Sequence, residues 1–290
     1  MSGMAYLNGD FLPLSEAKIS VLDRGFLFGD GVYEVIPAYG GELFRLPQHL
    51  ARLQRSLDGI RLANPHSEAE WTHILQQVVD HSSEPEQNVY LQLTRGVQTR
   101  RDHVVSEPMQ PTVFSMSNPI LPLSPEVINN GIKAVTMDDI RWQYCHLKTT
   151  ALLPNVLLKQ HAHEAGAAEA LLVKGGFVTE GSASNFFIVE QGVIITPPKS
   201  AKLLPGVTRD LVLELAAEHG LPHREAEVPL QQLQSADEIW LTSSTREVVP
   251  VTQLDGQPVG SGLPGEVWKT LRDCYQIFKR QQCRLQEGQS

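Results

Sequence analysis

The chain has 290 residues, enough for one large domain or two modest ones with a real core. Its 24 basic and 33 acidic residues give a net charge of -9. That balance argues against nucleic acid or an anionic membrane as the main partner, because either needs a basic face. No apolar run approaches the roughly 20 residues of a spanning helix, and no signal-peptide pattern opens the chain, so we expect a cytoplasmic protein. Three cysteines without CxxC spacing argue against a disulfide framework, and we expect no metal site.

The first 118 residues are predicted to form a small N-terminal α+β domain. Glycine-rich two-residue turns predict two hairpins, formed by residues 5–7 with 11–14 and 32–39 with 42–46. One helix is predicted from Pro47 to about residue 59, and a second begins at Ser67, where Glu70 completes a capping box. Further strands are expected at residues 88–94 and 111–116.

Residues 119–125 hold three prolines, which stiffen and extend a chain, so we predict an interdomain linker there. Residues 126–290 then form a larger C-terminal domain. Its predicted helices are 154–165, 208–218 and 264–279, and its predicted strands are 168–174, 177–179, 185–190, 193–196 and 238–242. Strands joined mostly by tight turns, with segregated helices, favour an α+β fold over a Rossmann sheet.

Lys148 is the most informative candidate for chemistry. No Asp, Glu or Arg lies within five residues of it on either side. If the fold buries an ammonium group in such a setting, its pKa falls, and a neutral amine attacks aldehydes. Lys148 therefore suits Schiff-base chemistry, although a lysine that extends to solvent from an apolar segment has the same local sequence.

Two segments are suited to binding an anion. Residues 204–208, Leu-Pro-Gly-Val-Thr, lead into a predicted helix N-terminus, where free amides favour phosphate, unless Thr208 is an ordinary N-cap. Residues 242–245 place four hydroxyl groups at the end of a strand, as a phosphate cradle or a polar loop. Arg52, expected on the exposed side of its helix, is either a countercharge or a solvated side chain.

Two further groups of charged residues are candidates for binding a cofactor or a substrate. Glu180 lies in a Gly/Ser-rich stretch between two hydrophobic strands, either as a solvated acid or as a partner that keeps a ring nitrogen protonated. Arg100, Arg101 and His103 follow a strand and suit a substrate carboxylate, since arginine grips carboxylates with two parallel hydrogen bonds. Together, a nucleophilic lysine, an acid, phosphate donors and a carboxylate trap match the needs of a pyridoxal-phosphate enzyme acting on amino acids.

Several ordered motifs carry a resemblance to a known family. They are Asp23-Arg24-Gly25-Phe26-Leu27-Phe28-Gly29-Asp30-Gly31-Val32-Tyr33-Glu34-Val35, His49-Leu50-Ala51-Arg52-Leu53, Thr94-Arg95-Gly96, Asp139-Ile140-Arg141-Trp142, Lys148, Thr179-Glu180-Gly181-Ser182-Ala183-Ser184-Asn185, Gly206-Val207-Thr208-Arg209 and Thr242-Ser243-Ser244-Thr245. From about Tyr6 to the last helix, the chain resembles the fold type IV pyridoxal-phosphate aminotransferases, most closely the D-amino-acid (D-alanine) branch. The resemblance implies a two-domain architecture, with a small sandwich-like N-terminal domain and a larger C-terminal pseudo-barrel domain.

The resemblance also implies roles for the cofactor-binding residues. Lys148 forms the Schiff base with pyridoxal 5′-phosphate and shuttles the proton between the substrate and the cofactor. Glu180 pairs with the pyridinium nitrogen, and Leu204 packs against the ring. The phosphate is held by Arg52, Val207, Thr208, Ser243 and Ser244. The implied active site lies between the two domains of a homodimer.

The substrate carboxylate is expected to bind Tyr33 and an Arg-x-His pair. Arg101 and His103 are separated by one residue, as in that pair. If positions are counted from Gly96 instead, the family arginine corresponds to Arg100. The loop thus carries an apparent one-residue insertion, and either arginine fits. Arg246 replaces a small residue expected at its position and is a candidate to reshape the substrate pocket.

The implied reaction is a ping-pong transamination that converts D-alanine and a 2-oxo acid to pyruvate and a D-amino acid. Three other enzyme activities share the fold: branched-chain L-amino-acid transamination, the aminodeoxychorismate lyase reaction, and (R)-amine transamination. A non-catalytic binding protein is a fourth alternative, which the presence of both Lys148 and Glu180 argues against. The expected partners are small amino acids and 2-oxo acids.

Overall fold

The computed structural model describes residues 3–105 and 109–283. Contacts within the chain divide it into two compact units. Unit 1 comprises Met1–Leu121, Leu147–Leu152 and Arg280–Ser290, and unit 2 comprises Pro122–His146 and Leu153–Lys279. Among the helices of the described residues, none has the length and apolar character needed to cross a membrane.

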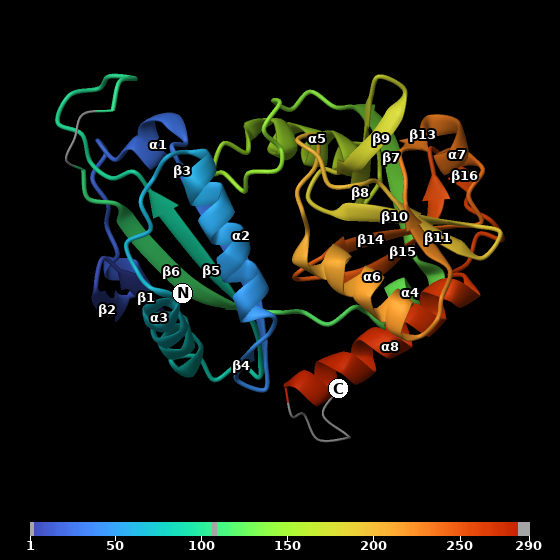
Figure 1. The fold of residues 1–290 in the computed structure, drawn as a ribbon, viewed down its shortest axis with the longest axis horizontal. Coiled ribbons are helices and arrows are strands. Elements are labelled where there is room, and N and C mark those ends of the chain that lie inside the picture. The colour runs from blue at the N-terminus through green and yellow to red at the C-terminus, as the bar shows by residue number, and fades with distance from the viewer. Residues whose placement is uncertain (1–2, 106–108, 284–290) are drawn as a thin grey trace. The chain divides into compact units, whose positions relative to one another are not determined.

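Unit 1 is built on a six-stranded antiparallel sheet with the strand order β2-β1-β6-β5-β3-β4 (Figure 1). Its strands are β1 (Met4–Leu7), β2 (Asp10–Pro13), β3 (Gly31–Tyr39), β4 (Glu42–Leu43), β5 (Glu86–Thr94) and β6 (Thr112–Pro119). The central strands β3 and β5 pair along their whole lengths, from Gly31 opposite Thr94 to Tyr39 opposite Glu86. This long pairing makes β3 a rigid support for the residues along it.

Two helices cover one face of this sheet, α2 (Leu46–Gly59) and α3 (Glu68–Asp80) (Figure 1). Leucines of α2, Trp71 of α3 and alternate residues of β3 and β5 form one buried cluster. Its members are apolar at helical spacing on the helices and at every second position on the strands, as one-sided burial requires. The short helices η1 (Leu14–Glu16) and α1 (Arg24–Phe28) lie in the connection from β2 to β3.

Unit 2 contains a ten-stranded mixed sheet that curls on itself (Figure 1). Its main path is β12-β11-β10-β14-β15-β7-β8-β9-β13, and β16 pairs with β15. The strands are β7 (Ile132–Asp138), β8 (Glu169–Lys174), β9 (Phe177–Gly181), β10 (Asn185–Glu190), β11 (Val193–Thr196), β12 (His223–Glu225), β13 (Val228–Pro229), β14 (Glu238–Ser243), β15 (Glu247–Leu254) and β16 (Gln257–Pro258). The pairs β7–β8, β7–β15 and β11–β12 are parallel, and the others are antiparallel.

The helices of unit 2 pack against this curled sheet. They are α4 (Pro125–Asn130), α5 (Leu153–Glu164), α6 (Val207–Glu218), α7 (Leu230–Gln234) and α8 (Glu266–Gln282). One apolar cluster is formed mainly by side chains of β8, β10, β14 and β15, and a second joins α5 to β7 and β8. The two units, each with its own sheet and helices, agree with the predicted α+β class and two-domain organisation.

The structure contains elements that the periodicity did not predict. The strand β15 was missed because Pro250 interrupts it, and proline normally argues against a central strand. The helix α1 was missed because it is only five residues long and contains Gly25; Asp23 caps it through a 2.7 Å hydrogen bond from the Gly25 amide. The short elements β7, α4 and α7 were also missed.

The unit boundary between Leu121 and Pro122 falls inside the expected linker, but the chain crosses again later. Leu147–Leu152, which we expected in the C-terminal domain, groups with unit 1. Backbone hydrogen bonds explain this grouping: the Tyr33 amide donates to the Lys148 carbonyl at 2.9 Å, and the Thr150 amide donates to the Gly31 carbonyl at 3.0 Å. The segment therefore pairs alongside the first residues of β3, and this pairing holds Lys148 beside Tyr33.

We expect the Gly31→Ala substitution to destabilise the protein by about 1–3 kcal/mol, because it overpacks this junction. A Cβ atom on Gly31 would lie 2.6 Å from the Leu93 carbonyl oxygen, a backbone atom of the paired strand. Urea unfolding of the variant measures the change. Gly3→Ala is the matched control, since a Cβ atom there meets nothing within 4 Å. Equal stability of the two variants would contradict the proposed close packing.

Candidate active site

Lys148 is half-buried in unit 1, and its Nζ lies 4.2 Å from the centre of the Tyr33 ring. Its backbone amide donates to Ser56 Oγ at 3.1 Å, which holds the residue against α2. Among the described residues, no carboxylate forms an ion pair with its Nζ. The absence of an ionic partner, expected from the neighbouring sequence, therefore extends to the described tertiary structure. The contact that the structure shows for the amine is with the Tyr33 ring.

Glu34, the residue after Tyr33 in the sequence, forms a buried polar cluster with His49 and Arg52 of α2. The expectation of an exposed Arg52 is wrong: the residue is 3% exposed. Its Nε and Nη2 donate to the two carboxylate oxygens of Glu34 at 2.8 and 2.7 Å, and His49 Nδ1 lies 2.8 Å from Glu34 Oε2. Burial alone would raise the pKa of Glu34, but the charge and hydrogen bonds of Arg52 hold that pKa well below its usual range. The Arg52 charge is thus largely offset by Glu34.

Sequence reasoning missed Glu34 and His49 as partners of Arg52. His49 and Arg52 are three residues apart on α2, a spacing that places two side chains on one helix face. Burial lowers the pKa of His49, which favours the neutral imidazole in this cluster. The helical spacing was the available signal, but the partner acid on β3 is supplied by tertiary packing.

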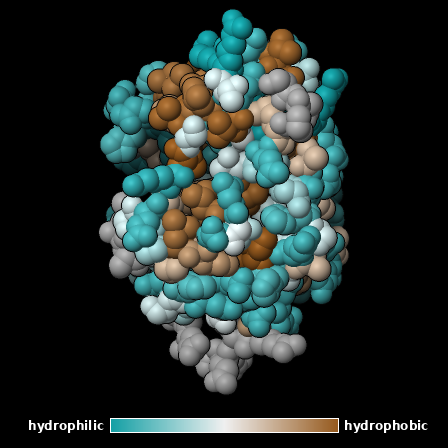
Figure 2. All heavy atoms as spheres, turned by 90° about the vertical axis from the view of Figure 1, so that its left-hand side faces the viewer, coloured by the Kyte–Doolittle hydropathy of each residue, from teal (hydrophilic) through white to brown (hydrophobic). Residues whose placement is uncertain are grey.

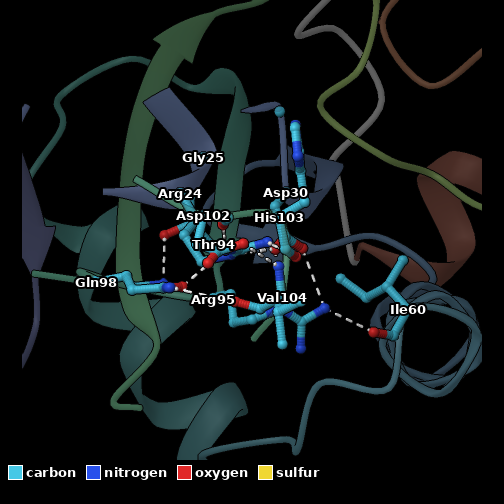
Figure 3. A network of polar contacts seen from close by, with 12 residues as sticks. Arg24, Gly25, Asp30, Ile60, Thr94, Arg95, Gln98, Asp102, His103 and Val104 are labelled. Atoms are coloured by element: carbon cyan, nitrogen blue, oxygen red, sulfur yellow. Dashed lines mark hydrogen bonds and ion pairs between the residues drawn. The ribbon is translucent and has the colours of Figure 1, made fainter. Parts of the chain in front are cut away.

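Arg24 organises the loop that carries the predicted carboxylate-binding residues (Figure 3). Its guanidinium donates to Asp30 Oδ2 and Gln98 Oε1 at 2.7 Å each, to the Asp102 carbonyl at 2.6 Å and to the His103 carbonyl at 3.2 Å. Because Arg24 is itself buried, it attaches an otherwise exposed loop to the body of unit 1. The loop backbone at Asp102 and His103 is therefore held in place.

The loop's side chains are arranged around Phe28. The Arg101 guanidinium lies 4.9 Å from the centre of the Phe28 ring, at the same distance as that of Arg24, and the His103 ring lies 5.2 Å away. Arg100 is exposed and makes no such contact among the described residues. Aromatic stacking thus restricts the side chains of Arg101 and His103, but leaves Arg100 unrestrained.

In unit 2, Glu180 is buried in a cluster with an excess of negative charge. Arg141 donates through Nε and Nη2 to Asp139 at 2.9 and 2.8 Å, and through Nη1 to Glu180. One guanidinium is therefore shared by two carboxylates. Burial raises the pKa of Glu180 to about 7, although Arg141 acts in the opposite direction. Such a site favours a further cation, and a protonated ring nitrogen is one.

Asn185 connects Glu180 to the segment that leads into α6. Its Nδ2 donates to Glu180 Oε2 at 3.2 Å and to the Leu204 carbonyl at 2.8 Å, while the Leu204 amide donates to the same Glu180 oxygen at 3.0 Å. A Cβ atom on Gly206 would lie 2.0 Å from Asn185 Oδ1, so glycine is required for this close approach. Sequence reasoning quoted Asn185 only as part of a motif and missed its central position.

The N-terminus of α6 is open to an anion. The alternative in which Thr208 is its N-cap is wrong, because the N-cap is Gly206, and no side chain in the described part of the chain caps the helix. Val207 and Thr208 instead form the first turn, whose amide groups have no partner within the helix. A helix of 12 residues with a free first turn attracts phosphate.

The hydroxyl-rich end of β14 lies beside this helix terminus. Thr242 stands opposite Asn185 in the sheet, and Asn185 contacts the Leu204 to Gly206 segment. The Oγ1 of Thr242 is buried and has no hydrogen-bond partner among the residues that the structure describes, and the half-buried Ser243 and Ser244 follow it. In unit 2 the structure therefore brings together Glu180, Leu204, Val207, Thr208, Ser243 and Ser244. A buried acid and a phosphate-type cradle fit the two polar ends of pyridoxal 5′-phosphate.

Comparison with known proteins agrees with this chemistry. Residues 31–254 match the family model for amino-transferase class IV. The chain belongs to the class IV aminotransferases. It is 43% identical over 269 residues to a D-alanine aminotransferase of Bacillus licheniformis, which covers 93% of this chain and 94% of that protein. It is 36% identical over 277 residues to a D-alanine aminotransferase of Staphylococcus aureus (strain COL), covering 94% and 96% of the two chains.

Solved structures of this aminotransferase family superpose closely. The branched-chain amino acid aminotransferase of Escherichia coli aligns with a TM-score of 0.92 at 25% identity, covering 99% of this chain and 98% of that one. A T.th. branched-chain amino acid aminotransferase, solved with pyridoxamine 5′-phosphate, aligns with a TM-score of 0.89 at 30% identity, covering 95% and 93%.

We expect the Glu180 carboxyl of the cofactor-free protein to titrate near pH 7, as burial dictates. Because this pKa lies above the ordinary 4.5, the native state binds more protons between those values, and the Glu180 contribution to stability falls as pH rises through that range. Carbon-13 NMR of labelled glutamate follows the titration, and Glu180→Gln assigns the signal. A carboxyl that titrates near its ordinary value would contradict the buried site.

Proposed function

We propose that this class IV aminotransferase is a pyridoxal-phosphate-dependent D-amino-acid aminotransferase that converts D-alanine and a 2-oxo acid to pyruvate and a D-amino acid. The observation that carries the proposal is the Lys148 amine, which has no ionic partner among the described residues and lies against Tyr33. The similarity to D-alanine aminotransferases, at 36–43% identity over most of the chain, supports the choice of substrate.

Pyridoxal 5′-phosphate supplies an aldehyde that carries the amino group and a ring that withdraws electrons from the substrate. Lys148 would hold the cofactor covalently through its amine, and the same amine would move the proton of the substrate α-carbon. A lysine serves here because its amine is both a nucleophile and a base when it is unprotonated. The backbone pairing of Lys148 with Tyr33 holds that amine in a defined position.

Glu180 keeps the ring nitrogen of the cofactor protonated. Its carboxylate shares a single guanidinium, that of Arg141, with Asp139, so the cluster has one negative charge in excess. A protonated ring nitrogen neutralises this excess. Asn185 and the Leu204 amide orient the Glu180 carboxylate. The Leu204 side chain would pack against the cofactor ring.

The cofactor's phosphate binds in the open first turn of α6 and at the end of β14. Amide groups of Val207 and Thr208 donate hydrogen bonds there, as do the hydroxyls of Ser243 and Ser244. Arg52 adds a guanidinium whose charge Glu34 already offsets, so it acts mainly as a hydrogen-bond donor. Most of the electrostatic attraction for the phosphate then comes from the helix terminus.

The substrate carboxylate binds Tyr33, Arg101 and His103. Arg101 and His103 both contact Phe28, and Arg24 holds the carbonyls of Asp102 and His103, so little conformational entropy is lost when they bind an anion. Arg100 lacks this restraint. These restraints and the Arg-x-His spacing support Arg101 as the arginine that binds the carboxylate, against the residue count from Gly96, which points to Arg100.

The protein forms a homodimer through unit 1. Large hydrophobic side chains are exposed on the segment before and within α1 and on the adjoining loop, at Ile19, Val21, Leu22, Phe26, Val97 and Val104. The Gln98 amide donates to the Leu22 carbonyl, which brings these two segments together. Figure 2 shows hydrophobic surface on the side of the structure where α1 and β2 lie in Figure 1. Exposed apolar area of this kind favours association with a second copy.

A screen of single half-reactions tests the function. We expect the purified protein to be yellow with pyridoxal 5′-phosphate and to lose that absorbance rapidly with D-alanine, because the amino group passes to the cofactor. L-leucine, an (R)-aryl amine and aminodeoxychorismate should react far more slowly or not at all. Rapid bleaching by L-leucine instead would make the enzyme a branched-chain aminotransferase. A colourless protein that ignores added cofactor would contradict the whole proposal.

Lys148→Ala is expected to abolish turnover while some cofactor remains bound, since Glu180 and the phosphate site are intact. Borohydride reduction of the wild type should attach the cofactor to the peptide that contains Lys148, and mass spectrometry identifies that peptide. Attachment to another lysine would refute the assignment.

Arg101→Ala should raise the KM for D-alanine by about tenfold to a hundredfold with a smaller change in kcat, because it removes a charge-assisted hydrogen bond to the carboxylate. Arg100→Ala is the matched control and should change KM by less than about twofold, because Arg100, exposed like Arg101, makes no contact with Phe28 among the described residues. Steady-state kinetics measures both variants. If Arg100→Ala raises KM as much as Arg101→Ala, the loop binds substrate through the other arginine.

A further inference from the structure

Arg246, the residue that departs from the expected small side chain, ion-pairs with a buried acid. Its Nη2 donates to Glu169 Oε2 at 2.5 Å, and its side chain is 31% exposed. Arg246 lies in the turn between β14 and β15, two residues after Ser244, which with Ser243 is predicted to bind phosphate. The charge of Arg246 is therefore paired with that of an acid in unit 2.

Glu169, at the start of β8, is completely buried and contacts a second part of the site. Its carboxylate accepts hydrogen bonds from the hydroxyls of Ser182 and Ser184, the latter at 3.2 Å. Burial would raise the pKa of Glu169, but the charges of Arg246 and Lys159 bring it below its usual range. Glu169 is thus an ionised group that joins the turn of Arg246 to the loop following Glu180.

The turn is fixed at two further points. The Arg246 amide donates to Ser243 Oγ at 3.3 Å, which occupies the hydroxyl as an acceptor and leaves its proton to donate to another oxygen. The next residue, Glu247, has a positive φ of 55° and accepts hydrogen bonds from Lys279 and Gln276 of α8 at 2.8 and 2.5 Å. The side chains of Arg246 and Glu247 therefore attach adjacent turn residues to different elements of unit 2.

We propose that the Arg246–Glu169 ion pair is a positioning device for the phosphate-binding turn. It fixes the hydroxyls of Ser243 and Ser244 relative to the loop that contains Glu180, so that the two polar ends of the cofactor find preorganised partners. Arg246 is a positioning residue that acts through the turn, and its role rests on the proposed function of that turn. Preorganisation raises affinity because the turn no longer loses freedom when the phosphate binds.

The structure also argues against Arg246 as a direct phosphate ligand. Glu169 has no exposed surface and needs a cation, because an unpaired buried carboxylate is costly. Lys159 Nζ, 3.2 Å away, is its second cation, but that side chain is 42% exposed and also donates to the Ala168 carbonyl. Lys159 therefore shares the same carboxylate without contacting the 243–246 turn, which makes it a matched control.

Binding of two cofactor forms tests the positioning role. The full-length protein, freed of cofactor, is titrated with pyridoxal 5′-phosphate and with pyridoxal, which lacks the phosphate, and tryptophan fluorescence reports Kd. We expect Arg246→Ala to raise the Kd of the phosphorylated form by about tenfold or more and to leave that of pyridoxal within about twofold, because only the phosphate contacts the turn. Lys159→Ala should leave the ratio of the two Kd values unchanged.

Other outcomes separate the possible failures. If wild type binds neither form, the proposed function itself fails. If wild type binds but Arg246→Ala weakens both forms equally, or neither, the residue has only a structural role and the positioning role is refuted. Arg246→Lys, which keeps the charge, should restore part of the phosphate-specific affinity. Thermal unfolding of each variant confirms that the protein used is folded.

Discussion

The hydrogen bond from the Tyr33 amide to the Lys148 carbonyl is the constraint on which the chemistry of unit 1 depends. It draws a short segment of chain from the middle of the sequence onto the start of β3. The strand is rigid because it pairs with β5 along its whole length and α2 packs over it. Lys148 therefore has a fixed backbone, while its amine remains without an ionic partner among the described residues.

Charge is distributed differently in the two units. In unit 1, the Glu34 carboxylate offsets the charge of Arg52 within a buried cluster. In unit 2, Asp139 and Glu180 share one arginine, so a negative excess remains where a protonated ring nitrogen is proposed to bind. The open terminus of α6 supplies the opposite polarity for phosphate. A cofactor with a cationic and an anionic end thus finds matching polarity in unit 2.

Much of the fold was predictable from local sequence. The hairpins around Asn8-Gly9 and Gly40-Gly41, the capping box at Ser67 and the strands β8 to β11 form where turn chemistry and periodicity agree. The missed elements show the limits of local sequence signals: β15 contains a proline, and α1, α4 and α7 are too short to show a helical period. The same limit hid the environment of Arg52, whose partner acid lies on a strand rather than on its own helix.

The sequence by itself determined the family, the reactive lysine as a candidate, and the types of residue that would serve a phosphate, a ring nitrogen and a carboxylate. These follow from side-chain chemistry and motif spacing, both of which can be read from neighbouring residues in the sequence. Tertiary structure alone decided the partners: Glu34 for Arg52, Arg141 and Asn185 for Glu180, Phe28 for Arg101, and Glu169 for Arg246. In each of these contacts the two residues are distant in the sequence or lie on different elements. Only the packing of the chain brings them together.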